Sequence, residues 1–125
     1  MNEFLVDSDV MIWFLRGKKP AVDLFYKIKQ LDVPFCSPIS IVEVLSDVKP
    51  GEEDATESFL NFFNVILVDR EIAQTAGWLV NERKSRGILM SLNDAIIVAT
   101  CLVGNLFLIT YNQKHYKGIK GLQIY

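Results

Sequence analysis

The stretch SLNDAIIVATCLVGNLFLIT, residues 91–110, holds a helix and a strand in direct succession. Its first part is apolar on nearly every side, and Gly104-Asn105 is a typical C-terminal stop for a helix. The run that follows, residues 106–110, is short and very apolar, which is typical of a strand buried on both faces. The stretch therefore predicts a helix over 91–103 followed by a buried strand, one unit of an α/β fold.

The same alternation runs through the rest of the chain. Apolar runs at 4–6, 33–36 and 65–68 predict three more strands, and 122–125 is a candidate fifth. Helical spacing and stop signals predict helices over 10–15, 20–31, 40–45, 54–63 and 72–86. No internal linker or repeat interrupts the 125 residues, so we expect one domain, 1–125, built on a parallel sheet that helices cover on both faces.

Composition excludes several classes of protein. Half of the residues are hydrophobic, yet no apolar run reaches the roughly 18–20 residues of a membrane span. The N-terminus lacks the basic region of a signal peptide. Cys36 and Cys101 lie far apart in apolar segments, which favours buried free thiols in a reducing cytoplasm over a disulfide. His115 is the single histidine, in a predicted surface loop, so a His-rich zinc site or a Ser-His-Asp triad is disfavoured.

The net charge of −2 argues at first against a nucleic-acid binder, because phosphate binding normally shows as a basic excess. Its distribution is uneven. Residues 43–57 carry six acids and one base, whereas residues 83–125 carry six bases and one acid, Asp94. One explanation of this uneven distribution is chance clustering of solvated charges. The alternative is that the basic C-terminal third holds a polyanion.

Three carboxylates stand at strand ends or helix starts. Asp7 follows a predicted strand directly, Glu43 has apolar neighbours on nearly every side, and Asp94 lies in the first turn of an apolar helix. Ligands of parallel α/β folds gather beyond the carboxyl ends of the strands, which favours one convergent acidic cluster. Because neighbouring carboxylates raise one another's pKa, such a cluster favours a hard divalent cation, for example Mg²⁺. A cation held this way activates water and stabilises a scissile phosphate.

Local structure explains the same residues without chemistry. The alternatives are an N-cap at Asp7 or Ser8 and two capping boxes, Ser40 with Glu43 and Ser91 with Asp94. Thr110 and Asn112 add neutral oxygens at the end of the fourth predicted strand, or form an ordinary exit into a loop. We expect Trp13, Trp78 and the phenylalanines at 59, 62 and 63 to lie in the core or an interface.

Four motifs occur in order: FLVDSDVMI (4–12), ISIVEVL (39–45), NDAIIVAT (93–100) and LITYNQKHY (108–116). Together they resemble the PIN-domain family, in particular the short VapC-type toxins of toxin–antitoxin pairs. The resemblance implies an α/β/α sandwich with a central parallel sheet of four to five strands. It also implies a Mg²⁺- or Mn²⁺-dependent endoribonuclease that cleaves structured RNA, tRNA or rRNA, and inhibits translation. The expected partners are a cognate antitoxin and a second copy of the chain.

Position by position, the resemblance assigns Asp7, Glu43 and Asp94 to the acidic metal site. The fourth catalytic position falls on Asn112, where many relatives carry Asp, so a second metal would be held weakly. Asp9, which often corresponds to Asn, compensates for that loss or orients its loop. The polar residues expected to support the site are Ser8, Asp9, Ser40 and Thr110.

Two rival functions remain open. A haloacid-dehalogenase-type phosphatase would use Asp7 and Asp9 as its D-x-D opening and Thr110 as its second motif, but no acid follows Asp94. A receiver-like signalling domain would need Asp69 as its phosphoacceptor and a lysine after a late strand, which residues 106–110 do not supply.

Overall fold

The computed structural model describes residues 3–125, and in that range the chain forms one five-stranded sheet. The strands lie in the order β3-β2-β1-β4-β5, and every neighbouring pair is parallel. Their bounds are β1 Phe4–Val6, β2 Phe35–Cys36, β3 Asn64–Val65, β4 Phe107–Ile109 and β5 Gln123–Ile124. The parallel sheet predicted from the apolar runs is therefore confirmed, including its fifth strand.

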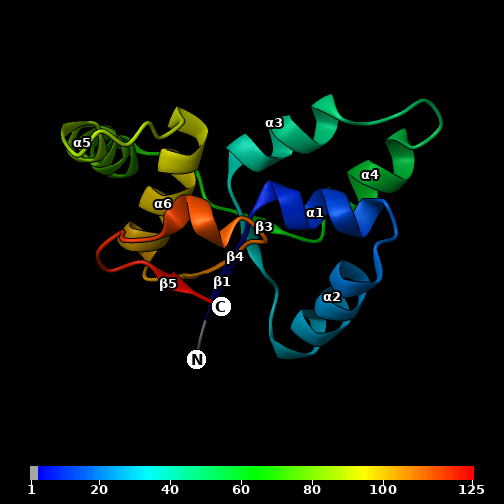
Figure 1. The fold of residues 1–125 in the computed structure, drawn as a ribbon. Helices are drawn as coiled ribbons and strands as arrows, with labels where there is room; N and C mark the ends of the chain where they lie inside the picture. The colour runs from blue at the N-terminus through cyan, green and yellow to red at the C-terminus, as the bar shows by residue number, and fades with distance from the viewer. Residues whose placement is uncertain (1–2) are drawn as a thin grey trace.

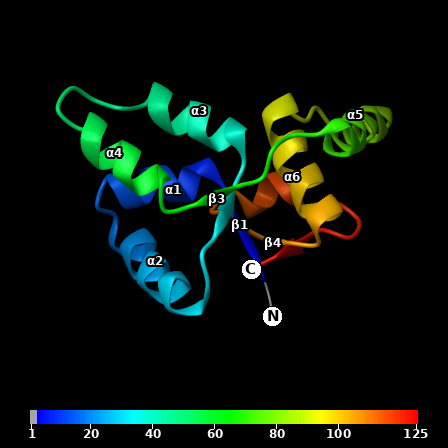
Figure 2. The same ribbon diagram turned by 180° about the vertical axis from the view of Figure 1, so that it is seen from behind.

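Helices cover both faces of this sheet, as Figures 1 and 2 show from opposite sides. Helices α1 to α4 pack on one face, and α5, α6 and the 3₁₀-helix η1 pack on the other. Their bounds are α1 Ser8–Leu15, α2 Lys19–Leu31, α3 Pro38–Ser46, α4 Glu53–Leu60, α5 Arg70–Ser85, α6 Leu92–Gly104 and η1 Gln113–Tyr116. The arrangement is the expected α/β/α sandwich.

Strand β1 divides the hydrophobic core into two halves. Successive side chains of a strand point to opposite faces. Phe4 and Val6 accordingly pack against α1 to α4, whereas Leu5 packs against α5 and α6. All three side chains are buried, which explains why β1 is a continuous apolar run rather than an alternating one.

Several predicted boundaries differ from the structure. Helix α3 begins at Pro38, not Ser40, because the Ser37 side chain caps it by accepting a hydrogen bond from the Ile39 N–H at 3.2 Å. The predicted capping box of Ser40 with Glu43 is therefore wrong. Strand β3 is shorter than predicted and exposed, as befits an edge strand, and α4 ends at Leu60 instead of residue 63.

Some buried and exposed groups also bear on the predictions. Cys36 and Cys101 are free and buried, as expected, and burial raises the pKa of their thiols to about 11 and about 12. The two tryptophans do not belong to the core: Trp13 is 42% exposed and Trp78 is 72% exposed. None of the helices within residues 3–125 has the length and apolar character needed to cross a membrane.

Candidate functional site

The candidate site lies beyond the carboxyl ends of β1 and β4, at the centre of the sheet. Val6 pairs with Ile109, and the Asp7 N–H donates to the Ile109 carbonyl at 2.9 Å. The pairing therefore brings Asp7 and Thr110, the residues that follow the two strands, to the same edge. The Thr110 hydroxyl donates to Asp7 Oδ2 at 3.0 Å.

Asp7 is both a helix cap and the centre of this site. Its Oδ1 accepts a hydrogen bond from the Ser8 N–H at 2.8 Å, so the predicted capping role is confirmed. Its Oδ2 accepts from Thr110 and from the hydroxyl of Tyr116, the latter at 2.8 Å. Only 6% of Asp7 is exposed. A nearly buried carboxylate that serves as more than a cap is a candidate functional group.

Tyr116 connects Asp7 to Asp94. Its hydroxyl lies 3.2 Å from Oδ1 of Asp94, a residue in the first turn of α6. Ser91 caps that helix by accepting from the Asp94 N–H at 3.1 Å, which leaves the Asp94 carboxylate turned to Tyr116. Tyr116 is not among the site residues predicted from the sequence, although a buried tyrosine usually directs its hydroxyl to a polar partner. His115 is exposed, as predicted, with Nδ1 3.8 Å from Asp94 Oδ2.

Glu43 joins the site from α3. The Ser8 hydroxyl donates to Glu43 Oε1 at 3.1 Å, so Ser8 connects this glutamate to the residue next to Asp7. Ser40 is not part of this network. It is fully buried, and its hydroxyl has no hydrogen-bond partner in residues 3–125.

Asp9 forms hydrogen bonds with the loop after β4. Its Oδ2 accepts from the Tyr111 N–H at 2.9 Å and lies 3.5 Å from the Thr110 hydroxyl. Asn112 is exposed and donates its backbone N–H to the Thr110 oxygen at 3.1 Å. Asn112 therefore contacts the network through its backbone. Asp9 orients the loop, which is one of the two roles expected for it.

The site carries uncompensated negative charge. Burial raises the pKa of Asp7 in spite of its hydrogen bonds from Tyr116, Thr110 and Ser8. Burial, followed by the charge of Asp7, raises the pKa of Asp9 to about 6. Burial also raises the pKa of Glu43. Asp94 is the fourth acid of the site. Over the described chain, its contact with His115 is the one ion-pair contact that the four acids make.

The donor set fits a hard divalent cation. Carboxylate and hydroxyl oxygens are the ligands that Mg²⁺ and Mn²⁺ prefer, and Mg²⁺ commonly takes one or two carboxylates with several waters. Asp7 and Asp94 are the candidate pair because one hydroxyl connects them, and Glu43 is linked to the site through Ser8. Within residues 3–125, no three His, Cys, Asp or Glu side chains converge as a ready-made metal site. A cation would thus rely on two carboxylates and on water.

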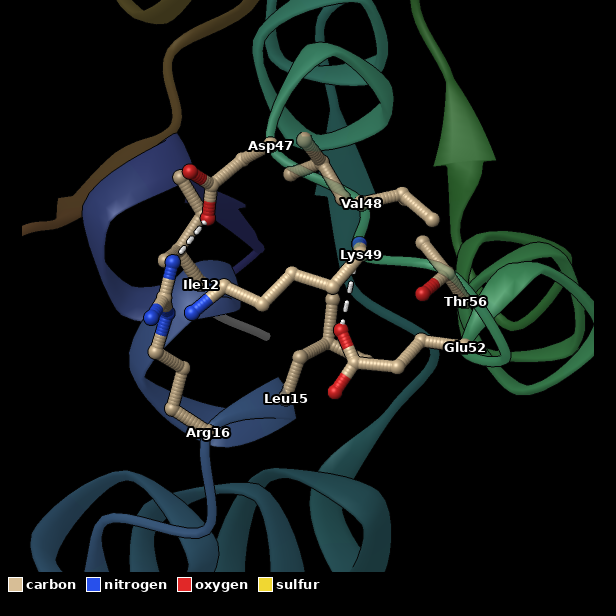
Figure 3. A pocket seen from close by; sticks show the side chains of 9 residues that line it. Ile12, Leu15, Arg16, Asp47, Val48, Lys49, Glu52 and Thr56 are labelled. Carbon is tan, nitrogen blue, oxygen red and sulfur yellow. Dashed lines mark hydrogen bonds and ion pairs between the residues drawn. The ribbon is translucent and has the colours of Figure 1, made fainter.

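A separate pocket lies between α1, α3 and the segment before α4 (Figure 3). Its volume is about 240 Å³, and it is lined by Ile12, Leu15, Arg16, Val44, Asp47, Val48, Lys49, Glu52 and Thr56. The lining contains two basic and two acidic residues, and Arg16 pairs with Asp47 at 2.6 Å. Glu52 accepts a hydrogen bond from the backbone N–H of Lys49 at 3.3 Å. None of the candidate metal ligands lines this pocket.

The sequence is similar to known ribonucleases. The family model described as PIN domain matches residues 4–120. The chain is 27% identical to Ribonuclease VapC1 of Methanocaldococcus jannaschii over 127 residues, which cover 99% of this chain and 88% of the relative. It is 30% identical to Ribonuclease VapC10 of Mycobacterium tuberculosis over 112 residues, 90% of this chain and 84% of the relative.

Solved structures show the same likeness. A toxin–antitoxin complex from Klebsiella pneumoniae contains a chain that superimposes with a TM-score of 0.80 at 30% identity, covering 96% of this chain and 95% of that one. DNA-bound VapBC from Salmonella typhimurium gives a TM-score of 0.86 at 19% identity, covering 100% and 98%. At that lower identity, the likeness concerns the fold alone.

Proposed function

The chain belongs to the PIN-domain family, and on this premise we propose that it is the endoribonuclease toxin of a toxin–antitoxin pair. It requires a divalent cation, Mg²⁺ or Mn²⁺, and cleaves structured RNA, tRNA or rRNA, so that translation stops. The observation that carries the proposal is the network of Asp7, Asp94 and Glu43 at the centre of the sheet. The relatives named as ribonucleases support the same activity.

The catalytic roles follow from the network. Asp7 and Asp94 would hold the cation, and Glu43 would act on it through a water. When bound, the cation supplies an activated water and stabilises charge on the scissile phosphate. Thr110 and Ser8 orient the carboxylates of Asp7 and Glu43 through their hydrogen bonds. Asn112 adds no charge, so we expect a single tightly held cation.

The basic C-terminal third provides the surface for RNA. Lysines at 114, 117 and 120 are exposed on and after η1, the element that carries Tyr116. Phosphate contacts by such side chains supply most of the affinity for nucleic acids without specifying sequence. The partners proposed beside RNA are a cognate protein antitoxin, in line with the toxin–antitoxin complex among the solved relatives, and a second copy of the chain.

The direct test is cleavage of purified tRNA and rRNA. Wild-type protein should cut RNA with Mg²⁺ or Mn²⁺ and stop when EDTA is added, and Asp94→Asn should abolish cutting without unfolding the protein. Undiminished cleavage in EDTA, or full cleavage by Asp94→Asn, would overturn the mechanism. A phosphatase of the rival type would release phosphate from small phosphoesters and leave RNA intact.

Controlled expression tests the biological role. Wild-type protein should arrest growth, and mapping of new RNA ends should identify the RNA that is cut. Expression of Asp94→Asn at the same level should leave growth and RNA ends unchanged. Growth arrest by both proteins would show that toxicity has another origin.

A further inference from the structure

A tyrosine hydroxyl holds the two central carboxylates of the site together. Tyr116 lies 2.8 Å from Asp7 and 3.2 Å from Asp94, measured from its hydroxyl oxygen to one oxygen of each carboxylate. The hydroxyl has one hydrogen, which two like-charged groups therefore share. Within the described chain, neither carboxylate has a lysine or arginine at ion-pair distance, so this hydroxyl is what connects them.

The ring of Tyr116 is fixed from several sides. It is 2% exposed and belongs to the core cluster beneath α5 and α6. The residue after it is anchored by Arg83 of α5, whose Nη2 donates to the Lys117 carbonyl at 3.1 Å. Arg83 is itself buried, which is unfavourable for a guanidinium unless it forms useful contacts. A hydroxyl held this rigidly can determine where the carboxylates stand.

We propose that Tyr116 is a positioning residue of the metal centre, whose hydroxyl keeps Asp7 and Asp94 in the arrangement that accepts a divalent cation. The inference rests on the proposed function. Groups that hydrogen-bond to metal ligands typically change metal affinity or activity by 10- to 100-fold when they are removed. Tyr116→Phe removes the hydroxyl and keeps the ring that fills the core.

The test is direct Mn²⁺ binding, measured by isothermal titration calorimetry and by the electron paramagnetic resonance signal of the bound ion, without RNA. Tyr116→Phe should raise the dissociation constant for Mn²⁺ by 10- to 100-fold. RNA cleavage at saturating Mn²⁺ should fall by far less, because the lost affinity is then compensated. Arg83→Lys, which leaves the hydroxyl in place but loosens its anchor, should raise the constant by a few-fold.

Two control variants separate positioning from a general loss of stability. Thr100→Val removes another buried hydroxyl, one that donates to the Ile96 carbonyl at 2.7 Å within α6. Tyr26→Phe makes the same chemical change on an exposed ring of α2. Both should bind Mn²⁺ as the wild type does. Thermal melts of all variants in EDTA identify any that fail to fold, and Arg83→Lys then carries the test.

The outcomes distinguish this inference from the proposed function. Equal or tighter Mn²⁺ binding by Tyr116→Phe would overturn the positioning role, as would an equal weakening in Thr100→Val. Weaker binding by Tyr116→Phe in a protein whose wild type cleaves no RNA would support the positioning role and overturn the nuclease. A wild type that binds no Mn²⁺ would overturn both.

Discussion

Helix α3 places two acids, four residues apart, in opposite surroundings. Glu43 faces the acid network, where its contact is the Ser8 hydroxyl at 3.1 Å, and burial raises its pKa. Asp47 caps the other end of the helix and forms an ion pair with Arg16 at 2.6 Å beside the pocket of Figure 3. One acid is neutralised by its own chain, whereas the other is left without a cation.

The difference shows how this fold separates stability from chemistry. An exposed ion pair such as that of Asp47 contributes little to stability, but it leaves no charge to be satisfied. The acids around Asp7 are held by hydroxyl and backbone N–H groups, which orient carboxylates without cancelling their charge. A site arranged in this way favours a cation from solution, whereas the surroundings of Asp47 need none.

The largest effect should come from removing the charge of Glu43, in contrast to that of Asp47 at the C-terminal end of α3. Glu43→Gln should lower RNA cleavage at a fixed Mn²⁺ concentration by at least about 100-fold, the size of effect typical of one lost charge-stabilising group. Asp47→Asn is the matched control and should leave the rate within about two-fold, because Arg16 stands apart from the acid network. Initial rates on one RNA substrate measure both. Equal losses in the two variants would contradict the comparison.

Removal of the metal should lower the melting temperature of the protein, and this effect should depend on the acids of the network and not on Asp47. At a Mn²⁺ concentration of 100 times its dissociation constant, binding stabilises the folded state by about 2.7 kcal/mol. For a chain of this size, that corresponds to a rise of roughly 10 °C in melting temperature relative to EDTA. Asp7→Asn should lose most of the rise and Asp47→Asn none of it. A full rise in Asp7→Asn would place the cation elsewhere, for instance among the acids at 52–54.

The free energy of unfolding of the metal-free protein should depend on pH because Asp9 titrates. Its pKa is about 6 in the folded protein and 3.8 ordinarily, so the folded state keeps a proton that the unfolded chain has lost. Stability therefore falls as the pH rises from about 4 to above 6. The shift corresponds to at most about 3 kcal/mol, which solvent screening at this partly exposed group reduces to about 1 kcal/mol.

Urea denaturation in EDTA at several pH values measures this change. The decline between pH 4 and pH 6 should be smaller in Asp9→Asn, which lacks the titrating group, than in the wild type. Asp47→Asn should decline in parallel with the wild type. Parallel curves for Asp9→Asn and the wild type would refute the raised pKa.

The smallest effects concern the start of α3. Ser37→Ala removes the N-cap and should lower the free energy of unfolding by about 1 kcal/mol. Ser40→Ala removes a buried hydroxyl that has no partner in the described chain, so its stability should be unchanged or slightly higher. Thermal melts distinguish the two. A clear loss of RNA cleavage by Ser40→Ala at full stability would show that Ser40 supports the site after all.

The sequence predicts the elements whose signals are local. Strands β1 and β4 are continuous apolar runs, and the Gly104-Asn105 stop ends α6 where predicted, with Asn105 in the left-handed conformation. The rule that ligands gather at strand ends correctly directs attention to Asp7 and Thr110. The start of α3 was misplaced because two serines compete there. Pro38 at the first helical position is the local signal that favours Ser37.

Residues that act through distant contacts could not be predicted in this way. Tyr116 meets Asp7 across 109 residues of chain, and no local pattern distinguishes its hydroxyl from that of an exposed tyrosine. Trp78 lies on an otherwise ordinary helix and is exposed because α5 is an outer layer of the sandwich. Sequence patterns show which residues are unusual, whereas the sheet order decides which of them meet.

The central place of β1 has a consequence for the timing of activity. Asp7 is synthesised roughly a hundred residues before β4 and Tyr116, which complete its surroundings. A chain still on the ribosome before residue 107 has neither the strand that pairs with β1 nor the hydroxyl that joins Asp7 to Asp94. An RNA-cleaving site built in this order stays incomplete until β4 and the segment that carries Tyr116 have been synthesised and have left the ribosome.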